Sequence, residues 1–248
     1  ETDPRVRWSR DVDGMVFEPP PPALYDGRVY YPAGDSFLAV DTATGDVDYE
    51  LEEGSYFGPA TVTLPRTYAS ETVVVPGRDD VVGVGGSGGV GLLGRRALTT
   101  RWRSPPVGGS GAPAGFGFNG GVGTAPVLAD DGLYVTGDGL TEHVSLLDPS
   151  SGGLRWSFTT EGNGRFSRPA VADGVAYVGV SYSGVLAVAD GAERWHRRLP
   201  ERQVDAPVVA DGSVYVPNGR TLYALDAADG STRWTLTPGG ETRFDRTS

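Results

Sequence analysis

The sequence contains no cysteine, lysine or isoleucine, and it has only two histidines, His143 and His196. The lack of cysteine excludes disulfides and thiolate metal sites. Two histidines argue against both a multi-histidine metal site and a histidine-based catalytic triad. No apolar run approaches the ~18 residues of a membrane helix, and no apolar stripe follows the helical period of ~3.6 residues. The sequence therefore predicts a strand-and-turn protein with no membrane span in this chain.

Basic charge is also scarce, and all of it is arginine. The chain has 21 basic and 32 acidic residues, which gives a net charge of −11. Nucleic-acid binding requires a basic stripe, so we do not expect a nucleic acid as a partner. Negative charge keeps a protein soluble, and concentrated salt screens the resulting self-repulsion. The composition favours a haloarchaeal source, with an actinobacterial one as the alternative.

A similar segment recurs several times along the chain. Its last copy, residues 206–236, contains four short apolar stretches at residues 208–210, 213–216, 222–226 and 233–236. Asp-Gly pairs separate the first two stretches and the last two, and such pairs supply the positive φ of tight hairpin turns. Five copies end on an aromatic residue: Tyr49, Trp102, Trp156, Trp195 and Trp234.

Four antiparallel strands repeated every roughly 40–45 residues are typical of a β-propeller blade. We therefore predict an all-β protein, a single β-propeller domain of four-stranded antiparallel blades over residues 1–248. Its five complete blades are predicted at residues 20–51, 58–104, 122–158, 167–199 and 205–237.

Residues 1–12 contain "VRW", the ending of one further copy. We expect this segment to be the strand that closes a five-bladed monomeric ring, because propellers close by pairing the chain ends within one blade. Two alternatives remain open at this point. The chain could be a segment of a longer one, or a partner could complete the ring.

The pattern V-Y-V-x…L-Y-A-L-D-A-x-x-G-x-x-x-W resembles the PQQ-like β-propeller repeat. That family includes quinoprotein alcohol dehydrogenases and the lipoprotein of the outer-membrane β-barrel assembly machine. The resemblance covers nearly the whole chain. It is weakest in the second copy, which lacks the Asp-Gly turn and carries a glycine-rich insert at residues 83–94.

The resemblance implies a structural role for the A-x-D-x-x-x-G-x-x-x-W segment, the tryptophan-docking motif of the family. The glycine lets the chain reverse, the aspartate accepts hydrogen bonds from turn amides, and the tryptophan lies between neighbouring blades. The residues expected in this structural role are Asp41, Gly45, Tyr49, Trp102, Asp148, Gly152, Trp156, Gly191, Trp195, Asp226, Gly230 and Trp234.

A binding site is expected in the loops that do not repeat. Connections between blades share one face of a propeller with the central funnel, and the longest here is residues 104–123. Aromatic and arginine side chains in these loops could bind an extended peptide or a small anionic ligand. The alternative is that the phenylalanines plug the funnel as additional core. The candidate residues are Tyr56, Phe57, Phe116, Phe118, Asn119, Arg165, Phe166 and Arg202.

The sequence favours a non-catalytic scaffold over an enzyme. Quinoprotein enzymes of the family use a vicinal disulfide and a tryptophan floor, and this chain has no cysteine and no tryptophan outside the repeated positions. We expect no catalytic residue, metal or cofactor, a protein partner, and an extracytoplasmic or cell-surface location, with an upstream lipid anchor left open. The alternatives are a reduced oxidoreductase binding PQQ and calcium, and the sensor domain of a larger receptor or kinase.

Overall fold

The structure is a computed structural model that describes residues 6–9, 21–33, 36–51, 59–63, 72–77, 80–86, 98–104, 124–137, 142–160 and 165–239. Every regular element among these residues is a β-strand, and the strands form five antiparallel sheets of four strands each. This confirms the predicted all-β propeller architecture. None of the described segments is an apolar helix of the kind that crosses a bilayer.

Each sheet is one blade, and its strands follow one another in chain order. The first three blades consist of β1 (Ala23–Tyr25), β2 (Arg28–Ala33), β3 (Ser36–Asp41) and β4 (Val47–Leu51); β5 (Thr61–Thr63), β6 (Thr72–Pro76), β7 (Val81–Gly86) and β8 (Leu98–Arg103); and β9 (Val127–Ala129), β10 (Gly132–Gly137), β11 (Glu142–Leu147) and β12 (Leu154–Thr160). The last two consist of β13 (Ala170–Ala172), β14 (Val175–Val180), β15 (Gly184–Ala189) and β16 (Ala192–Arg197); and β17 (Val208–Ala210), β18 (Ser213–Asn218), β19 (Thr221–Asp226) and β20 (Thr232–Leu236).

The hairpin between the first and second strands explains why the Asp-Gly pairs recur. Asp26 and Gly27 have φ angles of 45° and 71°, and Asp211 and Gly212 have 49° and 66°. Two consecutive positive φ angles match the twist of the flanking strands, and aspartate and glycine tolerate them better than other residues. The local sequence therefore selects the hairpin before any contact between blades forms.

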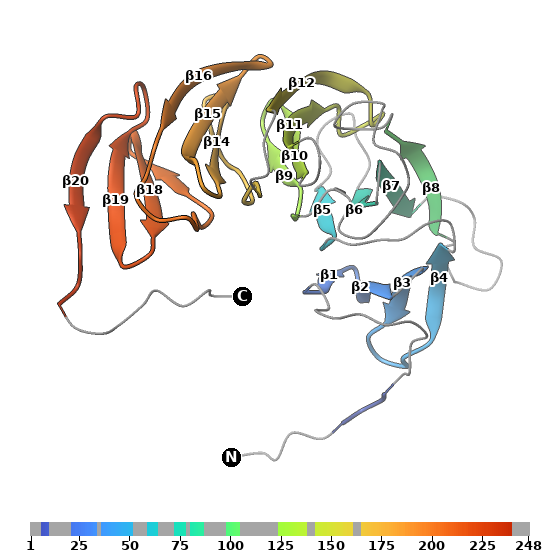
Figure 1. Ribbon diagram of the computed structural model, residues 1–248. Coiled ribbons are helices and arrows are strands. Elements are labelled where there is room, and N and C mark those ends of the chain that lie inside the picture. The colour runs from blue at the N-terminus through green and yellow to red at the C-terminus, as the bar shows by residue number, and fades with distance from the viewer. Residues whose placement is uncertain are drawn as a thin grey trace, which may run out of the picture.

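The blades pack side by side around their first strands, since β1, β5, β9, β13 and β17 contact one another in that order. Figure 1 shows the result as an open arc, with the first blade at one end and the fifth blade at the other. The described residues therefore do not show the ring closure that we expected from the sequence. The alternatives considered with it, a longer chain or completion by a partner, stay predictions.

The described part of the N-terminal segment packs on the first blade. Among residues 6–9, Trp8 donates its indole N–H to the carbonyl of Thr42 at 3.0 Å, and its ring lies directly over Gly45. Residues 6–9 are thus packed on the first blade and occupy the turn that another blade would have to reach. The rest of the predicted closing segment, residues 1–5 and 10–12, lies outside the described residues.

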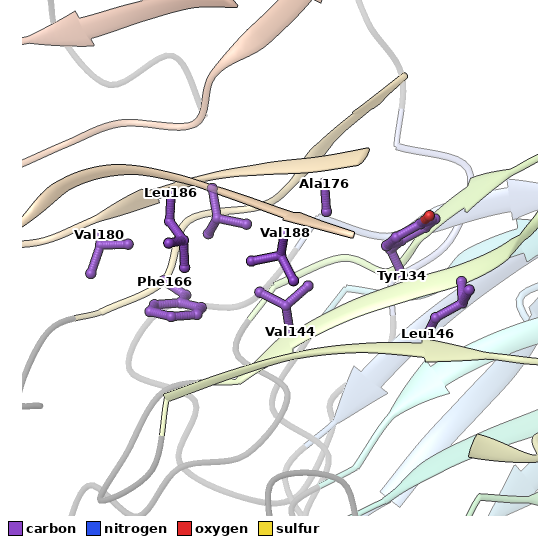
Figure 2. Close-up of a cluster of buried hydrophobic side chains, with 9 residues drawn as sticks. Tyr134, Val144, Leu146, Phe166, Ala176, Val180, Leu186 and Val188 are labelled. Atoms are coloured by element: carbon purple, nitrogen blue, oxygen red, sulfur yellow. The ribbon is translucent and has the colours of Figure 1, made fainter. Parts of the chain in front are cut away.

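The core lies between the blades. Figure 2 shows the cluster between the third and fourth blades, to which β10 and β11 contribute Tyr134, Val144 and Leu146. Most of the side chains opposite them come from β14 and β15, such as Val178 and Val188, which are fully buried. Each large apolar side chain buried in this way contributes about 1.5–3 kcal/mol. Stacking of neighbouring blades therefore holds the arc together.

Candidate functional site

The repeated tryptophans make one kind of contact, which we call the ring-on-turn contact: the ring of one blade packs on the turn glycine of the next. Trp195 of the fourth blade lies against Gly230 of the fifth and donates its indole N–H to the carbonyl of Ala227 at 2.9 Å. The other contacts between blades pair Trp102 with Gly152 and Trp156 with Gly191, and Trp8 of the N-terminal segment packs on Gly45 in the same way.

The aspartates of these turns are occupied by their own hairpins. Asp226 accepts hydrogen bonds from Arg233 at 2.7 Å and from the amide of Ala228 at 2.9 Å. Asp41 accepts them from the amides of Ala43 and Thr44 at 2.8 and 2.9 Å. Charged hydrogen bonds favour the ionised carboxylate. They lower the pKa of Asp226, mainly through Arg233, and that of Asp41, mainly through the amide of Thr44.

Asp148 provides a pH test of these turns. Its pKa lies below the ordinary value of 3.8, because the Ser150 hydroxyl and then the Arg155 guanidinium donate to it. The unfolded state therefore takes up this proton first as the pH falls. The stabilisation by Asp148 is complete above about pH 4 and is lost as the pH falls through the lower value of the folded state.

We expect Asp148→Asn to be less stable than the wild type at pH 7, with the difference shrinking as the pH is lowered below about 4. The measurement is chemical unfolding of both proteins from pH 7 to pH 2. A deficit of the same size at pH 7 and pH 2 would contradict this prediction.

We call one face of the propeller the loop face. It is formed by the connections between blades and by those between second and third strands, and it contains the described candidate binding residues. Tyr182, between β14 and β15, is 72% exposed and has a φ of 65°. Backbone bonds hold its segment on both sides: the amide of Ser181 donates to the carbonyl of Arg165 at 3.0 Å, and the amide of Tyr182 donates to that of Arg202 at 2.6 Å. The structure thus holds the segment of Tyr182 between the backbones of Arg165 and Arg202.

Asn218 anchors the loop that carries Arg202. This residue is 1% exposed. Its side chain accepts from the amide of Glu201 at 3.0 Å and donates to the carbonyls of Glu201 and Gln203 at 3.1 and 2.7 Å. A buried amide with three such bonds fixes the backbone on both sides of Arg202. The guanidinium of Arg202 makes no ion pair with any described residue.

The other predicted candidates divide into two groups. Phe166 is 4% exposed and lies among the side chains between the third and fourth blades (Figure 2), so it follows the core alternative and is not open to a ligand. The remaining candidates lie outside the described residues: Tyr56, Phe57, Phe116, Phe118 and Asn119.

Sequence reasoning missed Tyr182 and Asn218. Tyr182 lies in the connection between β14 and β15, and Asn218 is the last residue of β18, beside the connection to β19; only the connections between blades were searched in detail. The available signal was topological, because both kinds of connection end at the same face of a propeller.

A cavity of about 560 Å³ opens on the opposite face, lined mainly by residues of the fourth and fifth blades and by Asp131 of the third. Carboxylates of Asp131, Asp173, Asp190 and Asp226 line it together with Arg194 and Arg233. Arg194 pairs with Asp190 and Arg233 with Asp226, each at 2.7 Å. Within the described ranges, no three histidine, aspartate or glutamate side chains are grouped so that they could hold a metal ion. From the sequence we expected these turns to have a structural role only. The cavity forms because the fold brings turns of several blades together at one face.

The loop face also contains a serine–histidine pair. The Ser183 hydroxyl and Nε2 of His196 are 2.9 Å apart and exposed. No carboxylate among the described residues contacts the other ring nitrogen of His196. A serine nucleophile requires an oriented histidine base, usually held by a third group. The pair as it stands does not form a triad.

Solved structures similar to this chain share its fold. BamB from Moraxella catarrhalis is 14% identical, with a TM-score of 0.64, over 89% of this chain and 61% of its own. Quinohemoprotein alcohol dehydrogenase ADHIIG from Pseudomonas putida HK5 is 14% identical, with a TM-score of 0.64, over 92% and 42%. Apo AztD from Citrobacter koseri is 15% identical, with a TM-score of 0.60, over 90% and 60%.

This chain therefore spans about three-fifths or less of the length of these proteins. A sequence search of curated proteins finds no match. The sequence does match one family in three overlapping stretches, residues 1–101, 86–179 and 140–244. Together they cover nearly all of the chain, which therefore belongs to the family described as outer membrane protein assembly factor BamB.

Proposed function

We propose that this PQQ-like β-propeller is a non-catalytic scaffold that binds a protein partner through its loop face. The observation that carries the proposal is Tyr182, exposed and held between the loops of Arg165 and Arg202 by backbone hydrogen bonds. Tyrosine and arginine are enriched among the residues that dominate binding energy at protein interfaces. A non-glycine residue with positive φ persists only where its surroundings hold it, and such strained positions cluster at functional sites.

The chemistry of this site favours an extended protein segment that carries an acidic side chain. The ring of Tyr182 offers apolar area with little rotamer entropy to lose, and the guanidinium of Arg202 can bind a carboxylate in a bidentate manner. Because Asn218 fixes the Arg202 loop beforehand, ordering this loop costs little on binding.

Family membership supports an extracytoplasmic location. The family description is an outer membrane protein assembly factor, and such a factor acts on other proteins. For this chain, we propose only that it contacts a protein partner outside the cytoplasm.

The test is site-specific photo-crosslinking in the cells that produce the protein. With a photoreactive phenylalanine analogue at position 182, we expect a discrete protein adduct. Its yield should fall by about tenfold or more in Arg202→Ala, because a hot-spot side chain contributes at least about 2 kcal/mol and about 1.4 kcal/mol is tenfold in affinity. The control carries the analogue at Leu154, an exposed apolar residue of the outer strand β12.

Three results would contradict the proposal. The first is the same adduct from positions 182 and 154, and the second is an adduct unaffected by Arg202→Ala. The third is a rise in melting temperature with an absorbance change on saturation of the purified protein with PQQ and Ca²⁺, which would support the quinoprotein alternative.

A further inference from the structure

The two faces of the fourth and fifth blades carry opposite charge. Opposite the loop face lie the hairpins between first and second strands and between third and fourth strands, with the aspartates Asp173, Asp190, Asp211, Asp226 and Asp229. The described connections on the loop face contain two acidic residues, Glu201 and Asp205, and five arginines, which we call the arginine group: Arg165, Arg168, Arg198, Arg202 and Arg220. The loop face is therefore positive here, in a chain with a net charge of −11.

The arginines near the opposite face are neutralised by aspartates. Arg194 pairs with Asp190 and Arg233 with Asp226, each at 2.7 Å. The connections of the loop face cannot reach the same balance among themselves, because two carboxylates cannot neutralise five guanidinium groups. An excess of positive charge therefore stays on the described loop face of these blades.

The fold brings the connections of the arginine group into contact with one another. The amide of Ser181 donates to the carbonyl of Arg165, and the amide of Tyr182 donates to that of Arg202. Arg198 lies on the same side, since a Cβ on the glycine at position 184 would be only 2.9 Å from the Cα of Arg198. Backbone contacts thus place three of the five arginines around one connection.

The connection of Arg220 adjoins that of Arg202. Asn218, two residues before Arg220, donates from its side chain to the carbonyls of Glu201 and Gln203 at 3.1 and 2.7 Å. All members of the arginine group are exposed. Connections in contact with one another therefore bring exposed arginines to the same face of the molecule.

Gathering like charges in this way is unfavourable for the fold. Like charges repel, and this self-repulsion destabilises the compact state. The chain has more acidic than basic residues, so its composition does not force such an arrangement. Features that break a local physical rule occur mainly at functional sites. A positive surface on an acidic protein attracts and orients an anionic partner.

The partner that fits this surface best is an acidic stretch of a protein chain. Guanidinium groups bind carboxylates in a bidentate manner, and the exposed ring of Tyr182 offers apolar area to the same segment. An extended segment points every second side chain to one side, so acidic residues at alternate positions can reach the arginine group together. A nucleic acid fits less well, because its charge continues beyond the arginine group and the rest of this acidic chain would repel it.

We propose that the arginine group binds a protein segment in which at least three acidic side chains alternate with other residues. Three carboxylates match the excess of five arginines over two acidic residues in these connections. The inference rests on the protein-binding function proposed for the loop face and names the chemistry of the partner. Tyr182 and Arg202 anchor the segment, and Arg198 and Arg220 bind its further carboxylates.

The first test measures binding of a synthetic peptide to the purified chain. The probe is a fluorescent peptide of four Glu-Ser repeats, followed by fluorescence anisotropy at about 100 mM salt. We expect this peptide to bind, and a peptide of four Gln-Ser repeats not to bind. Arg198→Glu should weaken binding by about fivefold or more, because it removes an exposed ion pair worth up to about fivefold and adds a repulsion.

The matched control is Arg194→Glu, which changes the net charge by the same amount. Arg194 lies on β16, four residues before Arg198. Four strand residues span roughly 13 Å, more than the Debye length of about 10 Å at this salt concentration, so the affinity should change by less than about twofold. If Arg198→Glu does not fold, Arg198→Gln removes the charge without adding a repulsion and should give a smaller loss in the same direction.

The proposal fails if the Glu-Ser peptide does not bind, or if Arg198→Glu and Arg194→Glu weaken its binding equally. It also fails if an oligonucleotide of eight thymidines or a phosphatidylglycerol vesicle binds more tightly than the peptide. The partner would then be a nucleic acid or a membrane.

A second measurement separates this inference from the function on which it rests. In the crosslinking experiment at position 182, Arg198→Glu should lower the adduct yield by about fivefold or more, and the captured segment should contain at least three acidic residues. An adduct that is lost in Arg202→Ala but unchanged in Arg198→Glu would overturn the inference and leave the protein-binding function in place. The lack of any adduct from position 182 would overturn the protein-binding function itself.

Discussion

Replacing Trp195 with alanine is expected to lower the free energy of unfolding by about 3–5 kcal/mol, the usual cost of truncating a buried tryptophan. The ring is buried between two blades, packs at 5.8 Å from Tyr177 and covers Gly230. Its hydrogen bond to Ala227 is also lost, although the Tyr177 hydroxyl still donates to that carbonyl. The loss therefore comes from the apolar contact rather than from an unsatisfied carbonyl.

The matched control is Trp234→Ala, at the same position of the repeat in the last blade. Trp234 is about half exposed, and no described blade covers it, so we expect a cost of about 1 kcal/mol or less. Chemical denaturation should be followed by far-ultraviolet circular dichroism, because both variants change the number of tryptophans. Equal losses in the two variants would show that the ring is stabilising through its own blade.

Gly230→Ala is expected to destabilise the protein by about 2–5 kcal/mol, much more than Gly27→Ala. Both glycines have nearly the same backbone conformation, with φ angles of 72° and 71°. Adding a Cβ in this region costs about 1–2 kcal/mol by itself. At Gly27 the new atom meets nothing within 4 Å, whereas at Gly230 it would lie 2.6 Å from Cε3 of Trp195. The overlap adds about 1–3 kcal/mol of overpacking.

A double-mutant cycle isolates this overlap. In a Trp195→Ala background the ring is gone, and Gly230→Ala should then cost no more than Gly27→Ala. The measurement is the free energy of unfolding of the single and double variants. If Gly230→Ala costs the same with and without the ring, the contact across the blades does not constrain this glycine.

The fold was predictable because its signals are local. An Asp-Gly pair favours a hairpin because it tolerates positive φ angles, and alternation of apolar and polar side chains favours a strand. The sequence of each copy therefore predicts four strands without any information from the neighbouring copies. The second blade shows what happens where this local signal is weak. It lacks the Asp-Gly turn, yet β5 to β8 still form a complete sheet with Val74, Val75 and Val82 fully buried. Packing between its neighbours compensates for a weak local signal.

The candidate site was less predictable, because it depends on which loops meet. Arg165 and Arg202 were found from composition, but Tyr182 joins them only through backbone bonds made in the folded protein. Phe166 lies in the same type of loop as Arg202, and its sequence context does not reveal that its ring turns inward to the core. Whether a loop side chain faces solvent or a neighbouring blade is decided by the position of that blade.

Trp195 and Trp234 show most directly which features the sequence determines and which depend on the tertiary structure. By itself, the sequence determined the strand-and-turn repeat, the blade number and the identity of the aromatic residue at the end of each copy, all of which follow from local conformational preferences. Only the tertiary structure decided that one ring is buried on the glycine of the next blade while the other remains on an open face. Burial depends on what stands beside a residue in space, and two identical sequence positions acquire different roles when only one of them has a neighbour.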